Sequence, residues 1–254
     1  MNVNQMLRVS VLLWFFAGTG AAYAAGDWSW TLEPYLMASN IEGDAGLGRV
    51  AGVDVSVDTS DILENLEMGA MIHGEALHGN GWGVMLDYAF MRLGDDISGP
   101  LGGVTNATVR QGVLEAFAFQ RHQHGDDHFD VYGGIRWWDN DLDVNVNTVI
   151  LPGSPTADVE EDWVDPVIGG RYFRPVNERW TLLLQGDVGG FGIGSDFSYA
   201  LAAGAIYRIN DRTRLDLKYK GLWVDYEDGT PGTPDYFKYD TVTHGPIVGL
   251  MFDF

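Results

Sequence analysis

The chain has 254 residues, no cysteine and a formal net charge of −21 at pH 7. Without cysteine it cannot form a disulfide, use a thiol nucleophile or carry a lipoprotein anchor. Nucleic acid is excluded as an expected partner, because phosphate binding needs a basic surface. Hydrophobic residues make up 46% of the chain, yet its mean hydropathy is close to zero. This combination suits strands whose successive side chains face lipid and a polar interior.

Residues 1–24 have the features of a secretory signal peptide. Arg8 is the only charged residue before Asp27, and it precedes an apolar run that ends at Phe16. Ala22-Tyr23-Ala24 then provides a small-x-small cleavage site. We expect residues 25–254 to form the mature domain. No later stretch has the ~18 unbroken apolar residues that a membrane helix needs.

The rest of the chain favours an all-β fold. Apolar and polar side chains alternate in segments long enough for the ~9–11 residues of a tilted membrane-spanning strand. We predict a closed antiparallel transmembrane β-barrel of about ten strands, with eight or twelve as alternatives. The predicted strands cover residues 28–40, 67–78, 82–93, 108–121, 129–141, 163–174, 180–191, 197–209, 213–226 and 239–254.

The connections between these strands alternate in length. The tight ones contain Gly79 to Gly81, Gly125, residues 176–179 and residues 210–211. Most of the others are longer and acidic, and residues 192–195 are a short exception. Short turns on one side and longer loops on the other are typical of outer-membrane barrels, whose short turns face the periplasm.

The first long connection, residues 41–66, allows several structures. Val53 to Val57 alternate like a strand, and Ser60 to Leu66 could form a helical turn that starts on Ser60. The segment could extend a hairpin, cover the lumen or plug it. A twelve-strand barrel would require it to cross the membrane.

The last predicted strand has one apolar side. Every second residue from Val242 to Phe254 belongs to this side, and His244 is its one polar member. Pairing with the first strand would close the barrel and turn this side to lipid. A terminal Phe254 after alternating apolar residues resembles the C-terminal signal of bacterial outer-membrane barrels. The resemblance implies recognition by the barrel-assembly machinery.

Aromatic residues at outward positions fall into two bands, as the two interfaces of a bilayer select. A soluble sandwich would scatter these rings through its core. The predicted girdle comprises Trp28, Trp30, Trp82, Phe129, Trp137, Trp180, Trp223, Phe252 and Phe254.

Inward positions collect charged residues, because Arg or Lys facing lipid at mid-depth costs roughly 2–4 kcal/mol. Register arithmetic predicts that His73 faces Asp87 and that Glu115 lies near Arg136; solvated charges without fixed partners are the alternative. We expect a mostly filled lumen crossed by ion pairs. The predicted network, structural or pore-lining, is Glu33, His73, Glu75, Asp87, Glu115, Arg136, Asp165, Arg171, Asp187, Asp216 and Lys218.

A glycine-rich segment, Gly189 to Ser195, contains no lysine and precedes a strand pattern, which disfavours a nucleotide-binding loop. A tight hairpin is the structural interpretation. The longer stretch from Gly186 to Phe197 resembles a segment of small, largely uncharacterised Gram-negative outer-membrane barrel proteins of the OmpA/OmpW-like class. Residues 30–37, 165–172 and 244–250 are similar to other segments of that group. The resemblance covers most of the mature chain and implies a barrel and its location, but no established activity.

The sequence lacks a complete set of residues for a serine hydrolase. No Ser is clearly placed beside His244, and no Gly-x-Ser-x-Gly motif occurs. His122, His124 and His128 fall in a polar connection, where a solvated turn is a simpler interpretation than a metal site. We therefore expect no catalytic or metal-binding residues and no cofactor.

The sequence hypothesis is a non-enzymatic integral protein of a bacterial outer membrane, with a surface or envelope-structural role. A narrow porin-like channel and a lipid-modifying enzyme are the alternatives. Expected partners are outer-membrane lipid, lipopolysaccharide and the assembly machinery, while the oligomeric state stays open.

Overall fold

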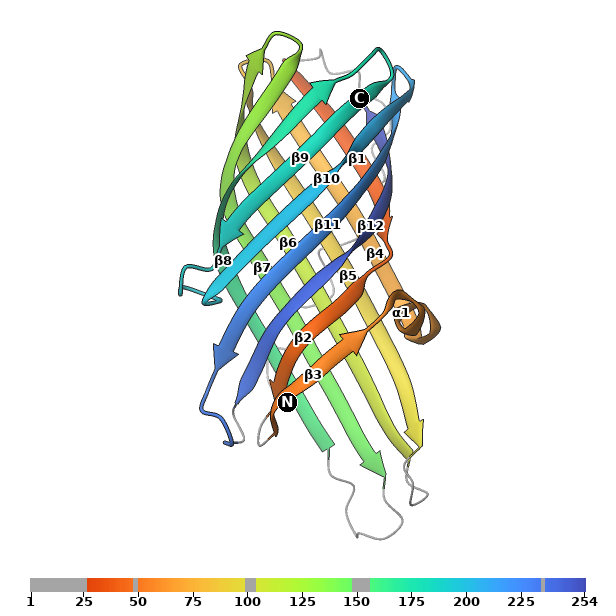
Figure 1. Ribbon diagram of the computed structural model, residues 1–254, viewed down its shortest axis with the longest axis vertical. Coiled ribbons are helices and arrows are strands. Elements are labelled where there is room, and N and C mark those ends of the chain that lie inside the picture. The colour runs from red at the N-terminus through yellow and green to blue at the C-terminus, as the bar shows by residue number, and fades with distance from the viewer. Residues whose placement is uncertain (1–26, 48–49, 99–103, 148–155, 234–235) are drawn as a thin grey trace, which may run out of the picture.

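The computed structural model describes residues 27–47, 50–98, 104–147, 156–233 and 236–254. The predicted signal peptide lies outside these residues. Twelve strands and one short helix run through the described chain (Figure 1). They are β1 (Trp28–Met37), β2 (Asn40–Leu47), β3 (Val50–Val57), α1 (Thr59–Asn65), β4 (Leu66–His78), β5 (Trp82–Ser98), β6 (Val104–His124), β7 (Asp127–Asn147), β8 (Thr156–Pro175), β9 (Trp180–Gly189), β10 (Phe197–Asn210), β11 (Thr213–Asp228) and β12 (Phe237–Asp253).

Ten of these strands form a closed antiparallel ring, as predicted. β1 is followed by β4 and then by each strand in chain order to β12, which pairs back with β1. The closing register runs from Thr31 opposite Asp253 to Met37 opposite Ile247. The amide of Phe254 also donates to the carbonyl oxygen of Trp30 at 2.9 Å. The ring therefore leaves no free strand edge along this closure.

β2 and β3 form a hairpin outside the ring. β12 is long enough to pair with β1 through one half and with β2 through the other, from His244 opposite Asn40 to Phe237 opposite Leu47. β3 pairs with β2. Residues 41–66 therefore extend the wall at one end and do not add two membrane-crossing strands.

The helix α1 follows β3. Its N-cap is Asp58, not Ser60 as predicted, because the Asp58 carboxylate accepts hydrogen bonds from the amides of Ser60 and Asp61. The Ser60 hydroxyl also donates to Asp58, and this bond, followed by the one from the Asp61 amide, holds the pKa of Asp58 below its usual value. No described helix has the length and apolar character needed to cross a membrane.

The two ends of the barrel differ as predicted. The tight connections lie between β4 and β5, β6 and β7, β8 and β9, and β10 and β11, at the end where Trp28 and Phe254 also lie. We call this the periplasmic end and the other the extracellular end. Four strands extend farther than predicted at the extracellular end: β5, β6, β7 and β8, with 17, 21, 21 and 20 residues. A tilted strand crosses a bilayer in ~9–11 residues, so these ends project beyond it.

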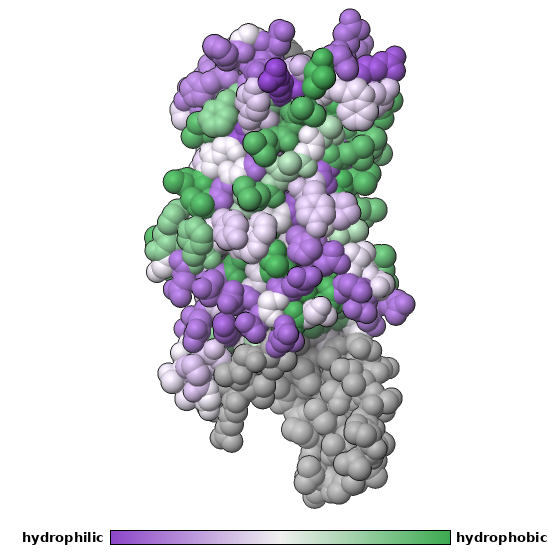
Figure 2. Space-filling view, in the orientation of Figure 1, coloured by the Kyte–Doolittle hydropathy of each residue, from purple (hydrophilic) through white to green (hydrophobic). Residues whose placement is uncertain are grey.

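The outer surface carries apolar side chains. In Figure 2 a hydrophobic belt lies between a hydrophilic rim and a hydrophilic zone at the start of the extracellular end. Along β12, Pro246, Val248, Leu250 and Phe252 are exposed, while Ile247 is buried. This is the alternation that the sequence predicts for a strand between lipid and lumen.

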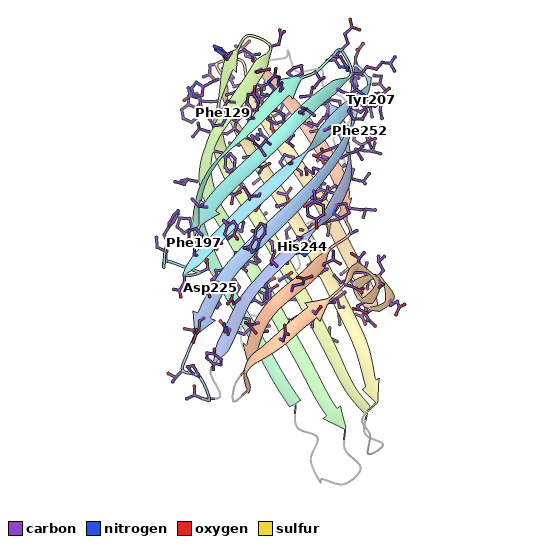
Figure 3. All side chains as sticks on the ribbon, in the orientation of Figure 1. Phe129, Phe197, Tyr207, Asp225, His244 and Phe252 are labelled. Atoms are coloured by element: carbon purple, nitrogen blue, oxygen red, sulfur yellow. The ribbon has the colours of Figure 1, made fainter. Side chains whose placement is uncertain are left out.

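The aromatic residues of the predicted girdle lie on the outside. Phe129, Tyr207 and Phe252 lie near the periplasmic end, and Phe197 lies about halfway along the molecule (Figure 3). Trp28, Trp30, Trp82, Trp180 and Phe254 are exposed, and Trp137 and Trp223 are partly exposed. Tyr199 and Trp223 stack with their ring centroids 4.6 Å apart at the extracellular band.

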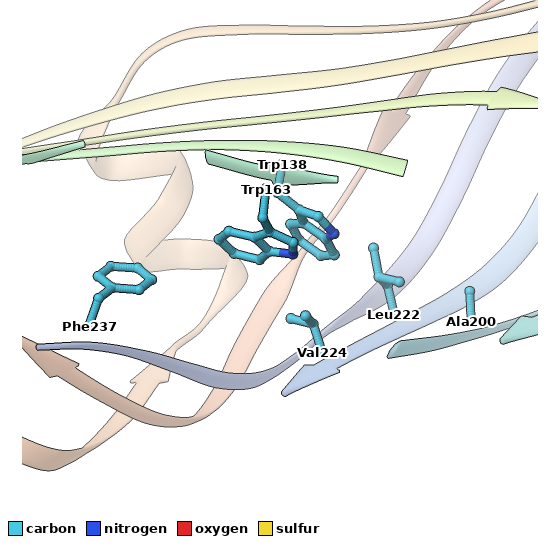
Figure 4. Packing of buried hydrophobic residues seen from close by; sticks show 6 residues of the cluster. All are labelled: Trp138, Trp163, Ala200, Leu222, Val224 and Phe237. Carbon is cyan, nitrogen blue, oxygen red and sulfur yellow. The ribbon is translucent and has the colours of Figure 1, made fainter. Parts of the chain in front are cut away.

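The buried core is the lumen itself. Met85, Phe117, Phe119, Tyr132 and Val167 form one cluster of buried apolar residues there. A second cluster combines two tryptophans with aliphatic residues from the opposite wall (Figure 4). Charged side chains occupy much of the remaining interior.

Candidate functional site: the charged lumen

The eleven predicted lumen charges lie inside the barrel on eight of the ring strands, because each occupies an inward position of the period-two pattern. Arg136 and Asp165 are fully buried. The eleven are Glu33 on β1, His73 and Glu75 on β4, Asp87 on β5, Glu115 on β6, Arg136 on β7, Asp165 and Arg171 on β8, Asp187 on β9, and Asp216 and Lys218 on β11.

The two cross-strand pairs predicted from hairpin register are both present. His73 is the register partner of Asp87, and its Nδ1 lies 3.1 Å from Asp87 Oδ2. Glu115 is the register partner of Arg136, whose Nε donates to Glu115 Oε1 at 2.7 Å. Both distances lie within the ~4 Å limit of an ion pair.

A cluster of two arginines and two carboxylates lies in the periplasmic half of the lumen. Asp130 is the cross-strand neighbour of Arg121 and of Arg171, and it accepts a 2.8 Å bond from Nε of each. Glu75 accepts from Arg171 Nη2 at 2.6 Å. The Arg171 guanidinium also lies 4.8 Å from the ring centroid of Phe119, a cation–π contact. Arg121 is absent from the predicted set, although alternation from Glu115 points it inward.

A second network crosses the middle of the lumen. The buried Arg136 donates to Glu115 and, through Nη2, to Asp187 Oδ1 at 2.9 Å. Asp187 Oδ2 accepts from the Tyr132 hydroxyl at 3.0 Å. Lys220 lies 3.4 Å from the other oxygen of Glu115. These bonds join strands from opposite parts of the ring.

A third group holds two acids and one cation. Lys218 Nζ lies 2.6 Å from Asp216 Oδ2 and 3.7 Å from Glu33 Oε1. Glu33 Oε1 and Asp216 Oδ1 are buried and accept no hydrogen bond from the described residues. The neighbouring Gly249 makes room for Glu33, since a Cβ there would lie 2.1 Å from Glu33 Oε1.

The glycine-rich segment folds inward at the end of β9. Gly190 and Gly192 have φ angles of 83° and 70°, which glycine adopts without steric cost. The turn brings Ser195 to the buried Asp165, which accepts from its amide at 2.7 Å and its hydroxyl at 2.8 Å. Asp165 also accepts from Ser198 Oγ at 3.0 Å. The segment is a hairpin, as predicted, and through Ser195 it is also hydrogen-bonded to the inward-facing Asp165 of β8.

An aromatic cluster closes the extracellular part of the lumen; we call it the aromatic plug, formed by Trp138, Trp163, Tyr226 and Tyr239. The ring centroids of Trp138 and Trp163 are 5.4 Å apart, and those of Trp163 and Tyr226 are 3.9 Å apart in a parallel stack. Figure 4 shows both tryptophans beside Leu222. Trp138 Nε1 donates to Asp165 Oδ2 at 3.2 Å, which ties the plug to the glycine-rich hairpin.

The plug is absent from the predicted residues, although a signal was available. Trp138 follows Arg136 by two positions and Trp163 precedes Asp165 by two, so the same alternation points them inward. Beyond the outer aromatic band, burial raises the pKa of Tyr226 to about 12, and its hydroxyl lies 3.5 Å from Glu161. Burial and the nearby Asp228 raise the pKa of Glu161 as well.

A cavity of about 420 Å³ occupies the periplasmic half of the barrel. Its lining extends from Arg179 and Arg208, near the periplasmic end, to Asp87 and Glu115. The Tyr35 hydroxyl donates to Asp87 Oδ1 at 2.7 Å at the inner limit of this cavity. A polar vestibule therefore leads inward and meets the networks described above.

The histidines do not form a metal centre. His122 and His124 lie exposed on β6, and His128 on β7 stacks on Phe173 at 4.4 Å, so the predicted polar connection is reduced to the turn at residues 125–126. Within the described ranges, no group of three His, Asp or Glu side chains could hold a metal ion.

His244 faces outward, as predicted. Its Nδ1 lies 2.6 Å from the Tyr219 hydroxyl, and its Nε2 lies 3.8 Å from Glu42 Oε1.

No family model and no curated protein matches the chain. Among solved structures, the translocator domain of the autotransporter NalP from Neisseria meningitidis is similar over 91% of this chain and 90% of its own, with a TM-score of 0.52 and 8% identity. The attachment invasion locus protein Ail of Yersinia pestis has a TM-score of 0.38 and 11% identity over 91% of this chain and all of its own. The first likeness agrees with the barrel fold.

The closed ring, its apolar belt between two aromatic bands and its charged interior decide the location. The protein is an integral β-barrel of a bacterial outer membrane. Its charges face an enclosed lumen, where they pair with one another.

Proposed function

We propose that the protein is a non-catalytic, structural component of the outer-membrane surface, with a lumen closed to solutes. The observation that carries the proposal is the series of side-chain contacts that crosses the lumen above the vestibule. Arg136, Glu115 and Asp187 form its buried ionic layer, and Trp138 and Trp163 stack beyond that layer. A solute would have to break paired charges and then displace two buried rings.

Planar-bilayer recording of the refolded protein tests this proposal. Wild-type protein should incorporate without discrete conductance steps. The double variant Trp138→Ala with Trp163→Ala removes the stacked rings and should show steps, while the lipid-facing control Trp137→Ala should stay silent. Reproducible wild-type openings would contradict the proposal.

A narrow channel is the second candidate, and the vestibule of about 420 Å³ is the observation that favours it. Its entrance carries Arg179 and Arg208, which would attract small anions from the periplasm. Wild-type openings with a preference for anions would support this candidate over the closed barrel.

The absence of catalysis is part of the proposal. The polar contacts of His244 described above join it to a phenol and a carboxylate, and no Ser or Thr hydroxyl among the described residues donates to it. We expect no release of fatty acid from lipopolysaccharide or phospholipid by purified protein. Turnover by wild type that His244→Ala abolishes would refute this part.

The proposed partners are the lipids around the barrel. The apolar belt matches phospholipid chains, and the rim above it meets the sugar and phosphate groups of lipopolysaccharide. We also propose that the assembly machinery recognises β12, whose outward side chains alternate with inward ones up to Phe254.

A further inference from the structure

The wall of the barrel has a seam between β1 and β4. The β1–β4 ladder runs from Trp28 opposite His78 to Pro34 opposite Ile72 and ends there. β4 continues to Leu66 with β5 on its other side, while β1 continues to Met37. Pro34 has no amide hydrogen and so cannot extend a ladder through its own nitrogen.

Exposure along β4 shows that the seam is open. Gly69 and Met71 precede His73 and Glu75 in β4 at the same two-residue spacing and so belong to its inward set. Gly69 is nevertheless exposed, and so is every residue from Leu66 to Ala70. Both sides of a strand become accessible where its edge has no neighbour.

An apolar pocket of about 70 Å³ lies directly behind this seam. Met37 on β1 and Met71 on β4 line it from the two sides of the seam, and Met91, Leu222 and Ile247 line it further in. Its polar side is formed by Tyr35 and Asp87, which share a hydrogen bond, together with Glu115 and Lys220. Flexible methionine side chains adapt readily to apolar guests of irregular shape.

The helix α1 covers the extracellular end of the seam. Ile62 is buried against Ile41 of β2 and Met91 of β5. The helix is held in place by Thr59, whose amide donates to Asn40 Oδ1 and whose hydroxyl donates to the Ser39 carbonyl oxygen. The helix therefore covers the seam above the pocket, and the unpaired edges of β1 and β4 lie below the helix.

The depth of the seam identifies what it meets. Ala70 is the register partner of Phe90, which stacks on Tyr88 with their ring centroids 6.3 Å apart in the outer aromatic band. Aromatic bands mark the boundary between headgroups and hydrocarbon. A side opening at this boundary faces the lipids of the outer leaflet.

We propose that the seam admits the end of one acyl chain of an outer-leaflet lipid, which occupies the pocket between Met37, Met71 and Met91. The pocket is too small for a headgroup. The polar part of the lipid therefore stays outside, beside α1. The pocket reaches into the lumen, where Glu115, Trp138 and Lys220 line it, but the acyl chain enters through the wall, so the test does not depend on whether the lumen conducts.

Methionine methyl groups provide the test. In deuterated protein with protonated Met methyls, reconstituted in phosphatidylcholine nanodiscs, we expect nuclear Overhauser contacts from acyl protons to the methyl groups of Met37, Met71 and Met91. Met91 is decisive, since it is buried. Met85 and Met251 line the vestibule and serve as internal controls without such contacts.

A matched pair of variants locates the entry. Gly69→Phe places a ring in the seam and should abolish the Met91 contact. Gly74→Phe adds the same ring to β4 at a position where a Cβ meets nothing within 4 Å, and the contact should persist. Nanodiscs of chain-deuterated lipid should also abolish it.

Three outcomes would overturn the proposal: no Met91 contact in wild type, equal contacts at Met85, or a contact that survives Gly69→Phe. Persistence in chain-deuterated lipid would assign the occupant to a co-purified free fatty acid and refute the bilayer lipid as its source.

Discussion

Arg136 is the cation at the centre of a buried ion-pair network in the lumen. Its side chain is fully buried and pairs with two carboxylates, at 2.7 Å from Glu115 and 2.9 Å from Asp187. Removing one partner from a buried ion pair leaves uncompensated charge and costs about 3–5 kcal/mol. Surface pairs contribute about 0–1 kcal/mol.

We therefore expect Arg136→Met to lower the free energy of unfolding by about 3–5 kcal/mol. Equilibrium urea unfolding in lipid vesicles, followed by tryptophan fluorescence, measures the change. Arg92→Met is the matched control, because Arg92 forms a 2.8 Å pair with Glu67 in which both side chains are about half exposed. Equal losses in the two variants would show that burial of the Arg136 network contributes little.

At the scale of the strands, a row of four aspartates crosses the extracellular end. Asp54 lies opposite Asp44, Asp44 opposite Asp240, and Asp240 opposite Asp225. Residues that face one another across strands point to the same side, and like charges there are destabilising. Burial, followed by the charge of Asp240, raises the pKa of Asp225.

The raised pKa fixes the sign of the pH effect. An acid whose pKa is higher in the folded state destabilises that state while it is ionised. Protonation removes this effect as the pH falls toward and through the raised value. We expect Asp225→Asn to stabilise the barrel by about 0.5 kcal/mol at pH 7 and low salt, and to lose the advantage near pH 4. Urea unfolding at both pH values measures it, with Asp126→Asn in the exposed β6–β7 turn as control. A gain that is unchanged at acidic pH would contradict the repulsion.

The alternation of inward and outward side chains explains which features of the strands could be predicted. It placed the eleven lumen charges and gave the His73–Asp87 and Glu115–Arg136 registers, since a period of two fixes both face and pairing. It did not predict the aromatic plug, because rings near strand ends were assigned to the membrane interface. The position of Ser195 beside Asp165 depends on left-handed backbone at Gly190 and Gly192, which no periodicity encodes.

The seam between β1 and β4 could not be predicted from the alternation of apolar and polar residues either. β1 and β2 both pair with β12. The β1–β12 ladder ends at Met37 and the β2–β12 ladder begins at Asn40, so Ala38 and Ser39 separate the two strands. Ala38 still donates to the carbonyl oxygen of Pro246 at 3.0 Å, so the interruption is local. Gly245 permits this approach, because a Cβ there would lie 1.9 Å from the Ala38 oxygen. Such a contact forms only when distant strands pair, so the sequence of either strand alone does not predict it.

At the scale of the whole molecule, closure of the ring can be tested by a disulfide, since the chain has no cysteine of its own. Leu32 and Phe252 are register partners across β1 and β12. Cross-strand Cα atoms lie about 4.5–5.5 Å apart, within the range that a disulfide spans. We expect Leu32→Cys with Phe252→Cys to oxidise fully in folded protein, as measured by mass spectrometry. Leu32→Cys with Leu250→Cys is displaced by two residues and should remain reduced. Oxidation of this control to the same extent would indicate a mobile register.

The closing contact also determines when folding can finish. Thr31 and Asp253 share a hydrogen bond across 222 positions of the chain, whereas the hairpins from β4 to β12 form between neighbours. Contacts between distant residues form slowly, because a large loop of chain must be closed first. The backbone amides and carbonyls on the β12 side of β1 therefore stay unpaired until β12 has formed. A chaperone that binds this polypeptide has to cover the unpaired edge of β1. A chain truncated before β12 would form an open sheet that cannot close into a ring.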